Sequence, residues 1–323
     1  MRDSGFEKWD CSSQALALDN DFPASRNEEC WPLTVLSFGA GQDSTAILYR
    51  LAYDSEFRSR FGKGCLLVLM ADTGDEHRHT YAHVARVRRF CREQGIEFHF
   101  ISRGQGFHSA AWASLHTQWE RNETVGLKAG VKSCTDNLKI KVFYRFLCWW
   151  LQTRLAMPFT GSECLKHFAR RYGKVRVIIG FAKGEEHRIT DPRAWKEQWK
   201  RESVTMLYPL IEVGWTRADC VDYIRSTGQP VPFPSNCRNC PYSSKLDLLW
   251  LFRNDRASYE RWVAAEERKL RKFSGRGGRN NTVWGKKTLP EVLNEAISEF
   301  GHLSDEHLTA IKFTHGHCVA SRY

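Results

Sequence analysis

The sequence has no apolar run long enough to cross a membrane. A membrane-spanning helix needs about 20 mostly apolar residues, and the longest candidate, 143–155, is interrupted by Arg145, Gln152 and Arg154. The first ten residues are polar and contain none of the apolar stretch that an export signal requires. These two absences predict a cytoplasmic protein without membrane contacts.

Eleven cysteines are many for a chain of 323 residues. Without an export signal, the chain is not expected to enter an oxidising compartment, so its thiols are expected to be reduced. A subset of them is then available to bind metal or to do redox chemistry. Cys65, Cys91 and Cys148 lie in apolar surroundings and are interpreted as core residues.

The formal net charge of +11 favours an anionic partner. A nucleotide, a nucleic acid or both would fit, while a basic protein without a large partner remains the plainer alternative. Apolar residues make up 42% of the chain and include all twelve of its tryptophans, enough for a sizeable core.

Strands and helices are expected to alternate along the chain. Apolar runs predict strands at 33–37, 65–70 and 175–180, and an alternating pattern predicts one at 96–102. Helical spacing predicts helices at 44–53, 79–94 and 139–155, with another after the N-cap Thr216. This alternation predicts an α/β fold with a doubly wound, mainly parallel sheet, which binds ligands at the carboxyl ends of its strands. No internal repeat is visible.

The character of the chain changes near residue 230. We expect an N-terminal extension at 1–30, a nucleotide-binding domain at 31–229 and a helical, cysteine-containing region at 230–323. Within the last region, 229–235 is rich in proline, 246–270 is helical, and 274–279 is a flexible basic link. From residue 290 the pattern predicts one short helix and an irregular end.

The segment 37–45, Ser-Phe-Gly-Ala-Gly-Gln-Asp-Ser-Thr, stands between a predicted strand and a predicted helix. Gly39 and Gly41 allow the backbone to turn tightly and to approach an anion. The amino end of the helix offers N–H groups and a partial positive charge, and the Ser44 and Thr45 hydroxyls add donors. The segment is not a Walker A loop, because no Gly-Lys-Ser/Thr follows; an ordinary strand-to-helix turn is the alternative.

Residues 39–44, Gly-Ala-Gly-Gln-Asp-Ser, resemble the Ser-Gly-Gly-x-Asp-Ser loop of the PP-loop ATPases. That family has a HUP-like fold, and its loop holds the pyrophosphate of ATP, usually with Mg²⁺. Two positions depart from the pattern, Gly39 in place of Ser and Ala40 in place of Gly, and Ser37 stands near the lost hydroxyl. Four further segments, in the same order, resemble the PAPS-reductase-like branch of the family: 71–76 with Thr80, 132–141, 180–188, and 208–217 followed by 237–242.

The resemblance implies a nucleotide site, and the residue types suit it. Asp43 and Asp72 are carboxylates at two strand ends that can hold Mg²⁺, although Asp72 also suits a turn. Lys139 and Arg188 can neutralise phosphate charge, with solvated surface charges as the alternative. Glu186 can pair with Arg188 or with the ribose. The resemblance also places Ser37, Thr73 and Gly180 around the nucleotide.

Cys237-x-x-Cys240 has the spacing of a metal-binding pair. Cys134 lies in a polar loop beside Lys132, which would favour its thiolate. The sulfur-transfer component of DNA phosphorothioation systems resembles this chain most in motif, with a single cysteine followed by Thr in the slot of Cys134. The likeness implies a [4Fe-4S] cluster, with zinc as the rival. The candidates for a fourth ligand are Cys318, Cys220, Cys164, a non-protein ligand or none.

Three functions follow from these hypotheses. The first is an ATP-dependent adenylating enzyme that prepares an acceptor on DNA or tRNA for sulfur insertion. It would need a sulfur donor such as a cysteine desulfurase. The predicted helix with Arg86, Arg88, Arg89 and Arg92 would contact the nucleic acid.

The second is a PAPS or APS reductase using Cys318, but a Cys-Cys pair and the reductase tail motif are missing. The third is a non-catalytic nucleotide sensor, which the altered loop at Gly39 and Ala40 would permit.

Overall fold

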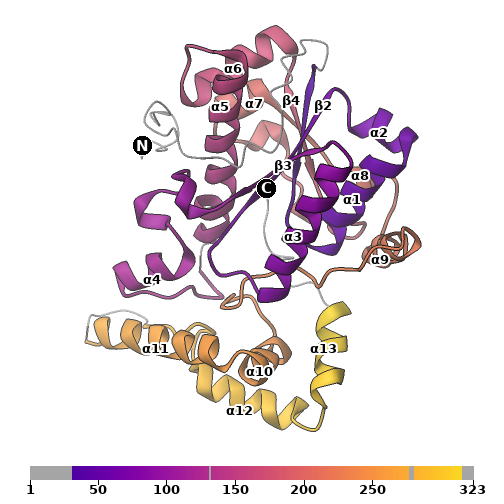
Figure 1. The fold of residues 1–323 in the computed structure, drawn as a ribbon. Coiled ribbons are helices and arrows are strands. Elements are labelled where there is room, and N and C mark those ends of the chain that lie inside the picture. The colour runs from indigo at the N-terminus through magenta and orange to yellow at the C-terminus, as the bar shows by residue number, and fades with distance from the viewer. Residues whose placement is uncertain (1–30, 131, 276–279, 315–323) are drawn as a thin grey trace.

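A five-stranded parallel sheet forms the centre of the molecule (Figure 1). The structure is a computed structural model, and it describes residues 31–130, 132–275 and 280–314. The strands are β1 (Leu33–Ser37), β2 (Cys65–Ala71), β3 (Glu97–Ile101), β4 (Val175–Ile179) and β5 (Val204–Leu207).

The strand order is β3-β2-β1-β4-β5, and all neighbouring strands are parallel. β1 is central, with Val35 opposite Leu67 of β2 on one side and opposite Val177 of β4 on the other. The chain builds the sheet outward from β1 in both directions, so the connections after β1 and β4 diverge. This confirms the doubly wound α/β fold and makes the carboxyl ends of β1 and β4 the expected ligand site.

Helices cover both faces of the sheet. The helices of the described residues are α1 (Gln42–Tyr53), α2 (Ser55–Phe61), α3 (Arg78–Glu93), α4 (Leu115–Asn122), α5 (Lys141–Leu155), α6 (Gly161–Tyr172), α7 (Gln198–Ser203), α8 (Pro209–Glu212), α9 (Arg217–Ser226), α10 (Lys245–Asn254), α11 (Arg256–Lys272), α12 (Leu289–Phe300) and α13 (Asp305–Thr314). None of the described helices has the length and apolar composition that a membrane span needs.

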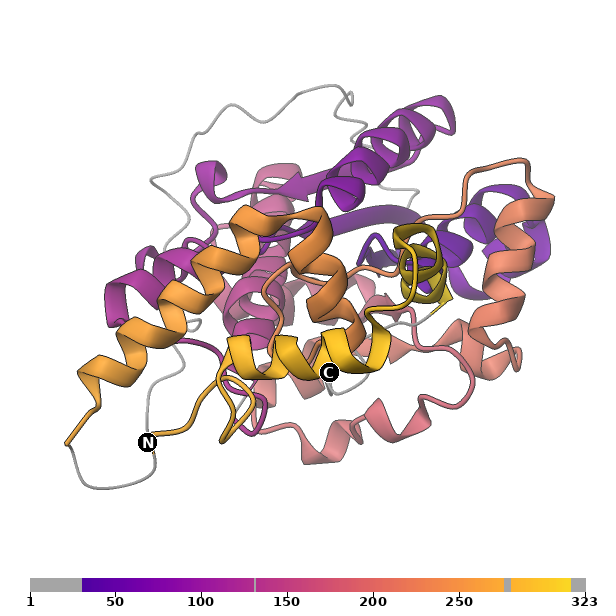
Figure 2. The ribbon, with the colours of Figure 1, turned by 90° about the horizontal axis from the view of Figure 1, so that it is seen from below.

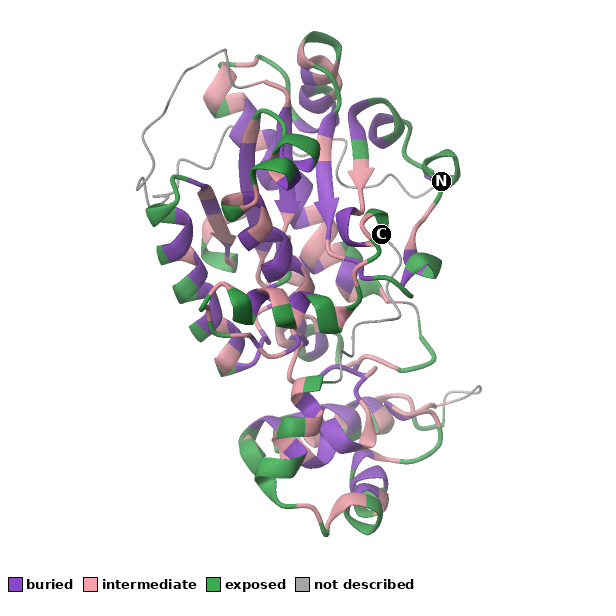
Figure 3. Cartoon of the chain, turned by 90° about the vertical axis from the view of Figure 1, so that its right-hand side faces the viewer, coloured by how far each residue is buried: buried purple, intermediate pink, exposed green. Residues whose placement is uncertain are grey.

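Two hydrophobic cores lie on opposite faces of the sheet. One contains α5, α6 and α7 with the side chains of β1, β2 and β4 that point to that face, and the other contains α1, α2, α3 and α9. The inner strands β1 and β2 are buried along almost their whole length, as the purple strands of Figure 3 show, which explains why their sequences are apolar without alternation.

A third core holds the C-terminal helices together. It is centred on the fully buried Trp262 of α11 and is completed by Leu115 and Trp119 of α4 and by Leu138. Helices α10 to α13 therefore gather at one end of the molecule, against the carboxyl end of the sheet (Figures 1 and 2). This core therefore includes residues of the predicted nucleotide-binding domain as well as those of the C-terminal helices. The division of the chain at residue 230 stays a prediction.

Several predicted elements need correction. The stretch 246–270 is two helices, α10 and α11, because Asp255 ends the first and caps the second through the Ser258 amide and hydroxyl. The tail contains two helices, α12 and α13, instead of one. β5 was not predicted, since its four residues are too few to show a period. Thr216 is confirmed as an N-cap, with Asp219 completing a capping box.

Candidate active site at the carboxyl ends of β1 and β4

The turn between β1 and α1, residues 37–45, folds around Ser44. We call it the phosphate loop, after the role that the resemblance implies. The hydroxyl of Ser44 accepts a hydrogen bond from the Gly39 amide at 3.2 Å, and the Thr45 amide donates to the Gly41 carbonyl at 3.1 Å. The end of β4 packs directly behind the loop, because a Cβ on Gly180 would lie 3.0 Å from the Ser44 nitrogen. The structure thus brings together Gly39, Gly41, Ser44, Thr45 and Gly180 at the point where the strand connections diverge.

Ala40 has a left-handed backbone, with φ of +56°. Residues with a Cβ pay about 1 kcal/mol or more for this conformation, and glycine does not. The resemblance has a glycine here, so the loop keeps the backbone shape of the pattern although the residue differs. Ala40 is buried, and its methyl group packs in the core shared by β1 and α1.

Asp43 belongs to a cluster of four charged side chains. Arg217 of α9 donates to the Asp43 carboxylate at 3.1 Å and to Glu185 at 3.4 Å, and Arg188 donates to Glu185 at 2.9 Å. Burial raises the pKa of Asp43, and Arg217 opposes this shift. Two carboxylates and two guanidiniums therefore stand beside the phosphate loop, with their charges balanced.

Sequence reasoning missed two members of this cluster, Arg217 and Glu185. Both lie inside the segments that resemble the PAPS-reductase-like family, so the signal was present without an assigned role. Glu186, which was expected beside Arg188 or a ribose, is exposed and accepts the Gly184 amide at 3.0 Å. The buried carboxylate beside Arg188 is that of Glu185.

Asp72 orders the turn that follows β2. Its Oδ1 accepts from the Gly74 amide and from the Tyr81 hydroxyl, both at 2.9 Å. Burial raises the pKa of the Tyr81 hydroxyl, and the Asp72 carboxylate raises it further. The turn role considered from the sequence is therefore present, and Asp72 stands at the end of the strand next to β1.

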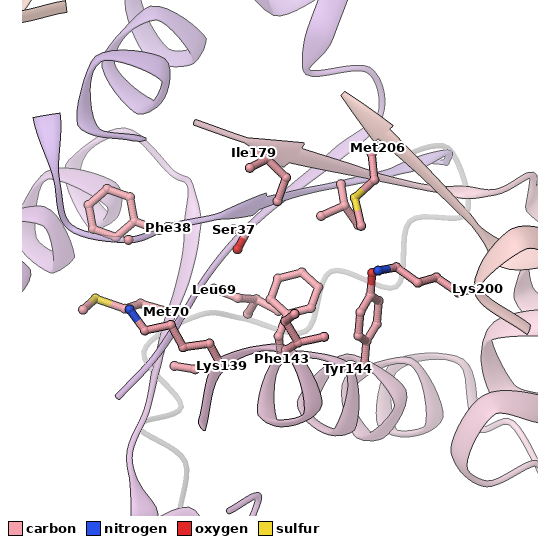
Figure 4. Close-up of a pocket in the computed structure, with 14 residues that line it drawn as sticks. Ser37, Phe38, Leu69, Met70, Lys139, Phe143, Tyr144, Ile179, Lys200 and Met206 are labelled. Atoms are coloured by element: carbon pink, nitrogen blue, oxygen red, sulfur yellow. The ribbon is translucent and has the colours of Figure 1, made fainter. Parts of the chain in front are cut away.

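A pocket opens at the same edge of the sheet (Figure 4). Its apolar walls come from the ends of β1, β2, β4 and β5 and from the start of α5: Leu69, Ile140, Phe143, Val177, Ile179 and Met206. Ser37, Gly39 and Lys139 line it on the side of the phosphate loop, so these predicted residues meet at one cavity. A pocket with apolar walls and a few polar groups is typical of a small-ligand site.

The segment containing Cys237 is fixed to the turn after β2. Residues Glu76 and Cys237 form an antiparallel bridge, and the Arg238 amide donates to the Asp75 carbonyl at 2.8 Å. The Cys237 sulfur lies 3.4 Å from the Thr73 hydroxyl and 3.9 Å from the Glu76 carboxylate. Burial raises the pKa of the Cys237 thiol well above its usual value, and the nearby Glu76 carboxylate raises it further. Lys139 opposes this shift with a smaller effect.

Lys139 links the thiol region to the pocket. Its ammonium lies 3.9 Å from Glu76, which is buried beside Cys237, and the same residue lines the cavity. It reaches both places because 135–140 is a π-helical turn that leads into α5. Such wide turns often occur at functional sites, where they redirect side chains.

The expected metal ligands lie in one region but do not form a prepared site. Cys134 and Cys237 both pack against the third core, and Cys240 is buried close by in sequence. Among the described residues, no group of three or more His, Cys, Asp or Glu side chains is arranged to hold a metal ion. Three thiols are suitable donors for a soft metal, so a cluster held by Cys134, Cys237 and Cys240 stays a prediction.

The candidates for a fourth ligand fare differently. Cys164 is fully buried in the first core and Cys220 in the second, whereas Cys134 and Cys237 border the third. Cys164 and Cys220 are therefore packing residues. Cys318 lies outside the described residues, as do 276–279 of the basic link and the extension 1–30. Cys91 and Cys148 are core residues as predicted, and Cys65 is half-buried against the first core. Cys65 is disulfide-bonded, whereas the other seven cysteines of the described residues are reduced thiols, as expected.

Comparisons with known proteins add little to this geometry. No protein-family model matches the chain, and no curated protein matches it. Among solved structures, the U34-tRNA thiolase NcsA from Methanococcus maripaludis with its [4Fe-4S] cluster is similar at 14% sequence identity and a TM-score of 0.39, over 82% of this chain and 81% of that chain. A similarity of this size shows neither the fold nor the function of this chain.

Proposed function

We propose that this protein is an ATP pyrophosphatase that transfers AMP to an oxygen atom of an acceptor. One observation carries the proposal: the phosphate loop, the Asp43 cluster and the apolar pocket meet at the carboxyl ends of β1 and β4. The five sequence segments that resemble PP-loop and PAPS-reductase-like enzymes supply the residues of this meeting point.

In the proposed reaction the acceptor oxygen attacks the α-phosphorus of ATP. The new bond joins the acceptor oxygen to phosphorus, the bond from phosphorus to the bridging oxygen breaks, and pyrophosphate leaves. The Gly41 amide would donate to the pyrophosphate. The Gly39 amide and the Ser44 hydroxyl, which are hydrogen-bonded to each other at 3.2 Å, would exchange this bond for one to the pyrophosphate. Thr45 is fully buried with its hydroxyl 2.9 Å from His83, so it would order the loop. Lys139 would stabilise the charge that develops.

The remaining site residues have supporting roles in the proposal. Asp43 would hold Mg²⁺ together with Asp72, and the ion, when bound, would neutralise charge on the phosphates. Arg188 is paired with Glu185, so it would act by keeping this carboxylate and Arg217 in place. Ser37, Thr73 and Gly180 would shape the site, and Glu186, being exposed, would contact at most the ribose.

We infer a nucleic-acid acceptor from the charge of the chain and from the surface of α3. Arg78, Arg86, Arg89 and Arg92 are exposed along this helix, which begins at the turn beside Cys237. A row of arginines beside a catalytic edge suits a phosphate backbone. A hydrosulfide ion from the sulfur donor would then attack the carbon that carries the activated oxygen. The carbon–sulfur bond forms, the carbon–oxygen bond breaks, and AMP leaves with that oxygen.

The test is an assay of purified protein with ATP and Mg²⁺, with and without mixed tRNA or duplex DNA, in which AMP and pyrophosphate are counted. Equal amounts of AMP and pyrophosphate, increased by one nucleic acid, are the expected result. Release of AMP and sulfite from adenylyl sulfate with a thiol reductant would instead support the reductase. Binding of ATP without any conversion would support the sensor, for which the altered loop at Ala40 is the structural argument.

A further inference from the structure

The pocket contains a buried lysine that the proposed reaction does not use. Lys200 of α7 is 8% exposed and lines the cavity. Its ammonium lies 4.6 Å from the centre of the Trp195 ring and 5.8 Å from that of Tyr144. Within the described part of the chain, no carboxylate forms an ion pair with it and no side chain or carbonyl accepts a hydrogen bond from it.

A buried ammonium group without an acceptor is costly unless a ligand supplies one. Burial lowers the pKa of Lys200, and the more distant carboxylates of Glu197 and Asp136 only oppose this shift. The two aromatic rings stabilise the cation from the side but accept no conventional hydrogen bond. The group is thus aimed into a pocket that lacks its partner.

The position of Lys200 shows which part of a ligand it would meet. Figure 4 shows Lys200 and Tyr144 at one end of the pocket and Lys139 at the other, with Ser37 between them. The end with Ser37, Gly39 and Lys139 adjoins the phosphate loop, so the phosphates of a nucleotide belong there. The apolar walls between the two ends suit a flat ring.

We propose that Lys200 recognises the nucleotide base, by donating a hydrogen bond to a ring nitrogen or carbonyl oxygen at the edge of a purine. The inference rests on the proposed function, since it assumes a nucleotide in this pocket. It makes Lys200 a specificity-determining residue. None of the five resembling segments includes it, so it would set base preference separately from the phosphate loop.

The experiment compares the wild type with Lys200→Met, which keeps the length and removes the charge, and with Lys196→Met, an exposed neighbour. Binding of ATP, of 1-deaza-, 3-deaza- and 7-deaza-ATP, and of inorganic tripolyphosphate is measured by calorimetry. A hydrogen bond from a charged donor predicts that Lys200→Met weakens ATP binding by about tenfold or more. The deaza analogue that lacks the accepting nitrogen should bind the wild type as weakly as ATP binds Lys200→Met. Lys200→Met itself should bind this analogue and ATP with the same affinity.

Tripolyphosphate should bind all three proteins alike, and the melting temperature of unliganded Lys200→Met should equal or exceed that of the wild type. Wild-type affinity for ATP in Lys200→Met overturns the inference and leaves the proposed function intact. Equal losses for ATP and tripolyphosphate, or three deaza analogues that bind the wild type like ATP, also overturn it. If the wild type binds neither ATP nor tripolyphosphate, the proposed function fails and the inference fails with it.

Discussion

Arg217 holds Asp43 at 3.1 Å, although the two residues are 174 positions apart in the chain. The same guanidinium reaches Glu185 at 3.4 Å, so one arginine of α9 orders a carboxylate from the first turn of α1 and another from the loop after β4. The site is therefore assembled across the central strand pair. Removing any one member changes the charge balance of the others.

If Asp43 holds Mg²⁺ as proposed, Asp43→Asn is expected to reduce AMP formation on the order of a hundredfold, because an amide cannot replace the charge of a carboxylate that binds the ion. The melting temperature should change little, since Arg217 keeps Glu185 as a partner. Steady-state rates and a thermal melt, with the exposed Asp222→Asn as the control, measure both effects. Full activity of Asp43→Asn would remove Asp43 from the catalytic site.

Cys237 is the best test of the expected cluster, because it is tied to the turn after β2. Protein purified without oxygen should contain iron and sulfide and show broad visible absorbance, and Cys237→Ala should lose all three. Cys91→Ala, which removes a buried thiol from the second core, is the control and should keep them. Colourless wild-type protein with zinc would assign the thiols to zinc, and protein without metal would end the sulfur-transfer proposal.

His83 connects the phosphate loop to the stability of the fold at low pH. Its Nε2 lies 2.9 Å from the Thr45 hydroxyl, and burial lowers its pKa to about 4 from an ordinary 6.5. Between pH 6.5 and 4 the unfolded chain binds a proton that the folded chain excludes. The free energy of unfolding should therefore decrease as the pH is lowered from 6.5 to 4, by up to about 1.4 kcal/mol per pH unit for this residue.

His83→Gln keeps a polar side chain beside Thr45 and removes the titrating group. Urea unfolding at pH 7, 6 and 5 should show a shallower pH dependence for this variant than for the wild type. The wild-type dependence will not vanish entirely, because burial also lowers the pKa values of His77, to about 2, and His79, to about 4. An unchanged slope in His83→Gln would show that His83 is not the group responsible.

Gln42, the first residue of α1, joins the phosphate loop to the last described helix. Its side-chain amide donates to the carbonyls of Pro232 and Phe313, both at 3.1 Å. Gln42→Ala removes two hydrogen bonds of about 1 kcal/mol each, so amide hydrogens of α13 should exchange faster. The exposed Gln198→Ala is the control. Unchanged exchange in α13 would mean that the pair of buried charges Lys312 and Asp247, 3.1 Å apart, holds the helix alone.

The sequence by itself determined the sheet and the phosphate loop, because both depend on local features. A strand buried on both faces must be apolar throughout, as Leu33–Ser37 and Cys65–Ala71 are. A turn that presents amides to an anion needs glycines and small polar residues in a row, as in Gly39 to Thr45. The capped helix starting after Thr216 was visible for the same reason.

Only the tertiary structure decided which side chains meet at the site. Nothing in the spacing shows that Arg217 returns to Asp43, that Glu185 rather than Glu186 turns inward, or that Lys200 enters the pocket from α7. The separation of Cys164 and Cys220 from Cys134 and Cys237 also depends on which core each helix covers. These relations arise from the packing of distant elements, and local sequence does not encode which of several exposed-looking charges will be desolvated.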